Sequence, residues 1–177
     1  MRSDDDLLGP LCVLYLVHAL PPIELTGPPL AAYECATSAA NRGWTTTVVS
    51  ADPSVTAWGD VRRSRELGEW FTRVAVPLTE EGTSTVPAPA TGRDRKGPAT
   101  RFFVEILRRT RPDLVHVIDD THLPSDWPEL AGEAGIPVVR KVTSTDEMAA
   151  LYAEVVKSQP LARAKRLGTR PLLHRRR

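Results

Sequence analysis

The first residue that could do chemistry is a histidine at the end of an apolar run. Residues 12–17 are apolar throughout, and His18 follows them at the start of a loop rich in proline. An imidazole can contact a ligand or exchange a proton near neutral pH, and it can equally form a structural bond within its own loop. Both roles are open for His18.

A second polar cluster follows another apolar run, residues 114–118. Asp119, Asp120 and His122 come directly after it and could bind a metal ion or act as acid and base. Acidic residues at a strand end are more often solvated or bonded to nearby backbone, so we expect no metal here. His116 lies inside the run, and we interpret it as a neutral core histidine rather than a catalytic one.

Several cofactor classes are disfavoured by what the loops lack. A dinucleotide fingerprint would place three spaced glycines after the first strand, but this loop has only Gly27, and no Walker lysine follows. Cys12 and Cys35 have no metal-ligand spacing, and we expect both to be reduced and buried. The sequence therefore predicts no bound cofactor and no metal.

The elements that position these residues form a strand, helix and strand unit. Residues 12–17 show no polar alternation, which is typical of a parallel strand covered on both faces. A helix should begin near Pro28 or Pro29 and stop at Gly43, ahead of a β-branched strand at 44–50. Ligands bind at the carboxyl ends of parallel strands, so the loop at residues 18–27 is where chemistry should be sought.

The rest of the chain repeats this alternation. Further strands are predicted at 71–78, 114–118 and 136–142, and a short helix within 51–67. Helices are predicted from Ala99, from Ser125 or Asp126 to Gly135, and from a capping box of Ser144 and Glu147. The pattern predicts an α/β fold, a Rossmann-like parallel sheet with helices on both faces, in a single domain.

The two ends of the chain differ from this body in composition and charge. We expect a flexible N-terminus at 1–10, the Rossmann-like domain at 11–157, and a disordered basic tail at 158–177, with a further disordered loop at 79–98. Residues 1–156 hold 15 Lys and Arg against 22 acidic residues, whereas 157–177 hold 8 basic residues and no acid. Such a tail could touch anionic surfaces, but it lacks the aromatic residues of a specific nucleic-acid binder.

We expect no signal peptide, because acidic residues outweigh Arg2 at the start of the sequence, and no apolar run is long enough to span a membrane. We therefore predict a cytoplasmic protein, whose tail could place it at the inner face of the membrane.

Three stretches together resemble one known family. They are VLYLVHALPPIELTGPPLAAYECATSAANRGWTTTVVS at the start, then RRTRPDLVHVI, then GIPVVRKV. The combination resembles the N-terminal, acceptor-side domain of retaining GT-B-type glycosyltransferases of the glycogen-synthase-like group, with a glycosyltransferase family 4-like N-terminal domain. The resemblance covers residues 11 to about 156, one half of a GT-B fold.

The resemblance implies transfer of a sugar from a nucleotide sugar to an acceptor hydroxyl, in carbohydrate metabolism. It implies substrate-binding roles for His18, for Gly27, where backbone would approach phosphate, and for Thr143, which stands where the family usually has a histidine. It assigns no catalytic residue and no metal. The residues given match only the acceptor-side half of the family's fold, so the resemblance implies a domain that is inactive alone and is either truncated or works with a separate donor-binding domain. The alternative is a noncatalytic binding or regulatory α/β domain.

Overall fold

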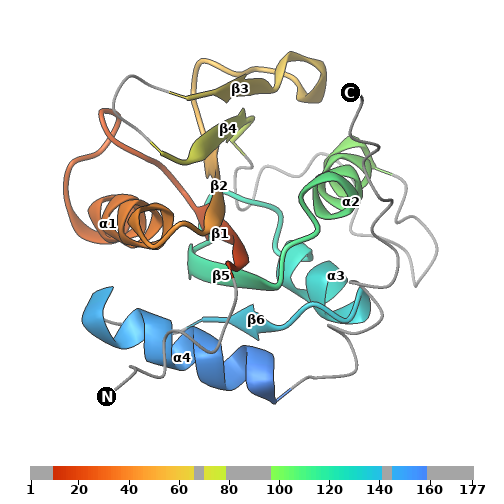
Figure 1. Ribbon diagram of the computed structural model, residues 1–177. Helices are drawn as coiled ribbons and strands as arrows, with labels where there is room; N and C mark the ends of the chain where they lie inside the picture. The colour runs from red at the N-terminus through yellow and green to blue at the C-terminus, as the bar shows by residue number, and fades with distance from the viewer. Residues whose placement is uncertain (1–9, 66–69, 79–96, 141–144, 159–177) are drawn as a thin grey trace, which may run out of the picture.

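The computed structural model describes residues 10–65, 70–78, 97–140 and 145–158, and in them the chain forms a sheet with helices on both faces (Figure 1). The strands are β1 Cys12–Val17, β2 Thr45–Ala51, β3 Arg62–Ser64, β4 Thr72–Val76, β5 Leu114–Asp119 and β6 Val138–Val139. The α-helices are α1 Gly27–Asn41, α2 Pro98–Thr110, α3 Trp127–Glu133 and α4 Thr145–Lys157, and η2 Trp58–Asp60 is a short 3₁₀ turn.

The strand order confirms the Rossmann-like prediction. The strands lie in the order β3-β4-β2-β1-β5-β6, and every neighbouring pair is parallel except β3 with β4. From β1 the chain builds outward through β2 to β4, and then returns to add β5 and β6 on the other side of β1. The order therefore reverses between β1 and β5, which is the place where open α/β sheets bind ligands.

One predicted element is wrong. Residues 51–67 were expected to contain a helix, but the described part of this stretch holds η2 and the antiparallel edge strand β3. Pro53 and Gly59 interrupt any helical run here, and Asp52 bonds the Ser54 amide at 2.8 Å to turn the chain instead. β3 then pairs with β4, from Arg62 opposite Ala75 to Ser64 opposite Arg73. The exposed arginines of this short strand discourage pairing with another chain.

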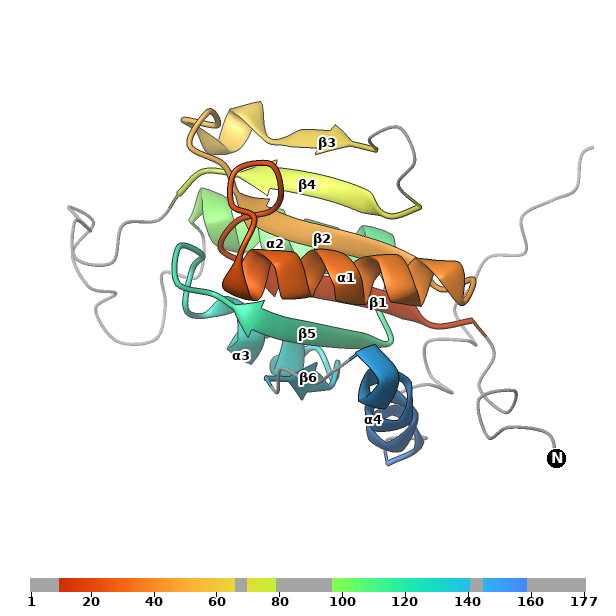
Figure 2. The ribbon, with the colours of Figure 1, turned by 90° about the vertical axis from the view of Figure 1, so that its left-hand side faces the viewer.

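The core consists of two apolar layers separated by the sheet. Val13, Tyr15 and Val17 of β1 face α1 and α4, whereas Leu14 and Leu16 face α2 and α3. Figure 2 shows α1 and α4 together on the viewer's side of the sheet, with α2 and α3 behind it. Because both faces of β1 are covered, all six of its residues are buried, as the unbroken apolar run predicts.

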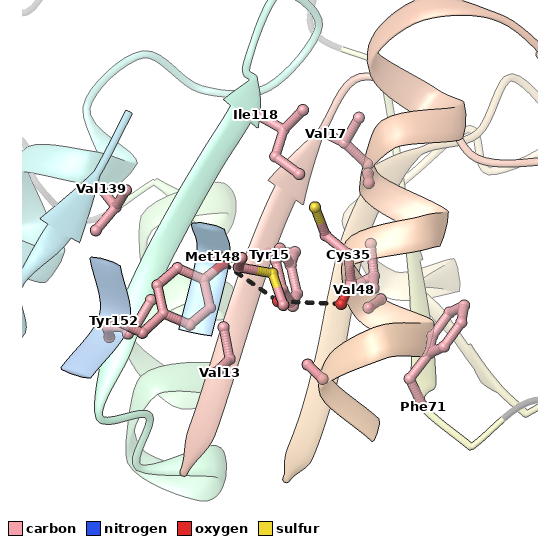
Figure 3. Close-up of a cluster of buried hydrophobic side chains, with 14 of the residues drawn as sticks. Val13, Tyr15, Val17, Cys35, Val48, Phe71, Ile118, Val139, Met148 and Tyr152 are labelled. Carbon is pink, nitrogen blue, oxygen red and sulfur yellow. Dashed lines mark hydrogen bonds between the residues drawn. The ribbon is translucent and has the colours of Figure 1, made fainter. Parts of the chain in front are cut away.

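A chain of polar contacts crosses the apolar layer that faces α1 and α4, and Figure 3 shows its part at Tyr152, Tyr15 and Cys35. Nδ1 of His116 contacts Oη of Tyr152, which lies 3.2 Å from Oη of Tyr15, and that hydroxyl in turn lies 3.4 Å from the carbonyl oxygen of Cys35. Burial raises the pKa of both phenols, so they stay protonated. The contacts join β5, α4, β1 and α1, and His116 is a core residue, as predicted.

Several predictions fall on residues outside the described ranges. They are the N-terminal segment, the disordered loop up to residue 96, the end of the last strand with Thr143 and Ser144, and the tail from 159 onward. Within the described part, β6 is shorter than the strand predicted at 136–142. The side chains of Cys12 and Cys35 are both buried, and neither is in a disulfide. No helix in the described ranges is long and apolar enough to cross a membrane.

Candidate functional site

His18 lies between two carboxylates at the carboxyl edge of the sheet. Its Nε2 is 2.9 Å from Oε2 of Glu24 in the same loop, and its Nδ1 is 3.1 Å from Oδ2 of Asp119 at the end of β5. The Asp119 contact has the distance of an ion pair but not the alignment of a hydrogen bond, so we treat it as electrostatic. The loop bond that the sequence left open is therefore present, and a second strand adds to it.

A register shift brings Asp119 to this position. β1 and β5 pair regularly up to Leu16 opposite Val117, but Val17 then pairs with Asp119, so that Ile118 is an extra residue on β5. Such a bulge bends the strand and re-aims the side chains that follow it. The carboxylate at the end of β5 thus comes level with the residue that follows β1.

Local contacts keep Asp119 ionised. Partial burial is the largest single influence on the pKa of Asp119, and it would raise this pKa. The hydroxyl and amide of Thr121, together with the nearby His18, outweigh burial, so the net effect lowers the pKa. The Thr121 amide lies 2.9 Å from Oδ1 of Asp119, which leaves Oδ2 to face the imidazole. Asp119 therefore has both the backbone-bonding role that the sequence suggested and a place in the site.

The other two polar residues after β5 are more peripheral. The His122 ring meets the His18 ring edge to face with centroids 6.0 Å apart. Asp120 lies 3.2 Å from Arg140, a solvent-facing pair that contributes little stability. Among the described residues, no group of three or more His, Cys, Asp and Glu side chains is arranged to hold a metal ion.

The loop that carries Glu24 is tied to the neighbouring strands. The Arg73 guanidinium on β4 donates to the carbonyl oxygen of Pro21, and it also lies 5.9 Å from the centre of the Tyr33 ring and 5.8 Å from that of Phe71. These contacts attach the middle of the loop to β4 and α1. Figure 2 shows the loop beside the carboxyl ends of the strands.

The start of α1 is poorly suited to bind an anion. Gly27 has φ +59°, and the space that a Cβ would occupy there is open, so a ligand could reach the backbone. The next two residues, Pro28 and Pro29, have no N–H to donate. The helix thus keeps its dipole but lacks two of the four unpaired amides that can bind a phosphate at a helix start.

Two hollows on the described surface lie away from His18. One hollow, of about 650 Å³, is lined only by residues of α1 and its end, between Tyr33 and Arg42, and is a shallow depression on that helix. The other, of about 530 Å³, lies between α2 and α3 near Leu107 and Ile136, at the amino ends of the strands. Neither collects titratable groups from several elements, so we place the candidate site at His18.

Sequence reasoning found two members of this site and missed the third. It singled out His18 and Asp119 from their places at the ends of buried strands, but it had no reason to place them together. Glu24 was missed, although a carboxylate six residues after His18 in a short loop is within reach of the imidazole. Gly27 lies at the opening of α1, next to this loop, whereas Thr143 lies outside the described residues.

No family model matches the chain, and a search of curated protein sequences finds no match.

Proposed function

We propose that this chain is the acceptor-side domain of a retaining GT-B-type glycosyltransferase, which works with a donor-binding domain supplied either by a longer form of the chain or by a separate protein. The observation that carries the proposal is the position of the His18 imidazole between Glu24 and Asp119, at the carboxyl ends of β1 and β5. An imidazole and two carboxylates offer both donors and acceptors for the hydroxyls of a sugar. Glu24 has a side chain 43% exposed, so a hydroxyl can compete for its contact with His18.

The first residues of α1 support a mechanism in which one domain binds the acceptor and another binds the donor. Pro28 and Pro29 remove amides that would otherwise bind phosphate, so this half would hold the acceptor and leave the nucleotide diphosphate to the donor-binding half. Gly27 would let the diphosphate come close to the backbone when the halves close. The family resemblance adds a substrate-binding role for Thr143. Closure would exclude water from the reacting groups, which the isolated chain cannot do.

The test has a binding arm and a turnover arm. Saturation-transfer NMR should detect weak binding of methyl glycosides of glucose, mannose or galactose to the purified chain. Glu24→Gln replaces a charged acceptor with a weaker neutral one, and His18→Ala removes the imidazole. Each variant should weaken that binding about tenfold, which corresponds to about 1.4 kcal/mol. Glu34→Gln is the matched control, because Glu34 is an exposed glutamate on the surface of α1, away from His18.

The turnover arm measures sugar release from nucleotide sugars. The chain alone should release none, and addition of the donor-binding domain should restore transfer to the glycoside. Turnover by the isolated chain, or glycoside binding that is unchanged in both variants, would refute the proposal.

The second candidate function is a noncatalytic binding domain that uses the same cluster. The observation that favours it is the start of α1, where two consecutive prolines leave little to contact a donor. In that case glycoside binding would persist and respond to Glu24→Gln, but no donor-binding domain would restore transfer.

A further inference from the structure

Exposed apolar residues lie next in the sequence to Glu24, whose carboxylate contacts His18. Ile23 and Leu25 flank Glu24 in the loop, with exposed fractions of 51% and 64%, and Leu30 follows in the first turn of α1 at 38%. The described ranges expose only two other large apolar side chains, Trp70 and Leu78. Apolar surface in a loop that also carries the polar cluster suggests a ligand that has both kinds of surface.

The charges at this edge disfavour an anionic ligand. Glu24 and Asp119 face the imidazole, and Asp120 lies on the same loop as Asp119, where Arg140 compensates it. Arg73 is the cation nearest to the loop in the described contacts, but it is directed at the carbonyl of Pro21 and the neighbouring rings. A phosphate or carboxylate on the ligand would meet carboxylates here, and the prolines of α1 offer it few amides.

From these two observations we propose the chemical class of the acceptor: an uncharged hydroxyl compound with an apolar substituent, such as an alkyl or aryl glycoside. Its hydroxyls bind the cluster of His18, Glu24 and Asp119, and its apolar part packs on Ile23, Leu25 and Leu30. This inference rests on the proposed function, because it takes that cluster to be the acceptor site. It goes further by excluding phosphorylated sugars and by assigning the exposed leucines to substrate binding.

The experiment compares three probes that share one sugar: the hexyl glycoside, the methyl glycoside and the methyl glycoside 6-phosphate. Dissociation constants are measured by NMR titration of the purified chain, with the hexyl compound kept below its micelle concentration. We expect the hexyl glycoside to bind at least tenfold more tightly than the methyl glycoside, and the phosphate to bind more weakly than either.

Two variants assign the effect to the loop. Leu25→Ser should remove most of the advantage of the hexyl chain and leave methyl glycoside binding within about twofold. Trp70→Ser is the control, because Trp70 is 68% exposed and precedes the amino end of β4, whereas the loop with Leu25 follows the carboxyl end of β1. It should leave all three constants unchanged.

The outcomes separate this inference from the proposed function. Equal binding of the methyl and hexyl glycosides, tighter binding of the phosphate, or a hexyl advantage that survives Leu25→Ser would overturn the inference while leaving an acceptor site at His18 intact. No binding of any probe would overturn both.

Discussion

Loss of the Tyr152 hydroxyl should lower the free energy of unfolding, because this hydroxyl contacts His116 and Tyr15 in the core. Tyr152→Phe keeps the ring, which is fully buried, and removes only the oxygen that contacts His116 and Tyr15. A phenol has one hydrogen, so if Tyr152 donates to Tyr15, then Nδ1 of His116 donates to Tyr152. The variant removes the acceptor of one buried donor and the donor to one buried hydroxyl. A buried group left without its partner costs about 1–3 kcal/mol.

For a domain of this size, about 1–3 kcal/mol corresponds to a fall in Tm of roughly 2–12 °C. Thermal and urea unfolding, followed by circular dichroism, measure both quantities. Tyr33→Phe is the control, because Tyr33 is half-buried on α1 and its ring contact with Phe71 does not need the hydroxyl. Tyr152→Phe as stable as the natural chain would show that the polar contacts through the core contribute nothing.

Four further predictions follow from single residues. Because the pKa of Asp119 is lowered in the fold, its ionised form stabilises the protein above about pH 4. Asp119→Asn should therefore be less stable than the natural chain at pH 7. Urea unfolding should show that this difference in stability shrinks as the pH falls below about 4. Gly27→Val should be less stable than Gly27→Asn by about 1–2 kcal/mol in the same assay, because φ is +59° and asparagine tolerates that region; equal stabilities would contradict it. Burial, with a smaller effect from Glu34, raises the pKa of Cys35 to about 11, so mass spectrometry should find this thiol unmodified by alkylating reagents at pH 8 until the chain is unfolded. Nitrogen NMR shifts should show His116 protonated on Nδ1, and an Nε2-protonated ring would reverse the direction of the contacts in the core.

The elements that the sequence predicted well are those whose patterns have one physical cause. The apolar runs of β1 and β5 have no polar alternation because the sheet is covered on both faces. The limits of α1 follow from proline at its start and from Gly43, which has φ +78° beyond its end. These features depend on residues within the element itself, so the sequence of that element is enough to predict them.

β3 and the site depended on contacts that local patterns do not contain. β3 has three exposed residues, and only its pairing with β4 makes it a strand. His18 and Asp119 are far apart in the sequence, and their contact needs both the strand order and the bulge at Ile118. The partner of His116 could not be foreseen for the same reason, because Tyr152 reaches it from a helix near the end of the described chain.

The reversal of strand order at β1 also governs when the sheet can close. The partner strand of β1 on one side, β2, ends at residue 51, but its partner on the other side is β5, and the Cys12 amide bonds Asp113, which is 101 residues away in the sequence. A nascent or truncated chain that ends before Leu114 therefore presents an apolar β1 with a row of unpaired backbone groups. Such edges recruit strands from other chains. During synthesis β5 thus acts as the segment that protects β1 from aggregation, as well as forming one wall of the site.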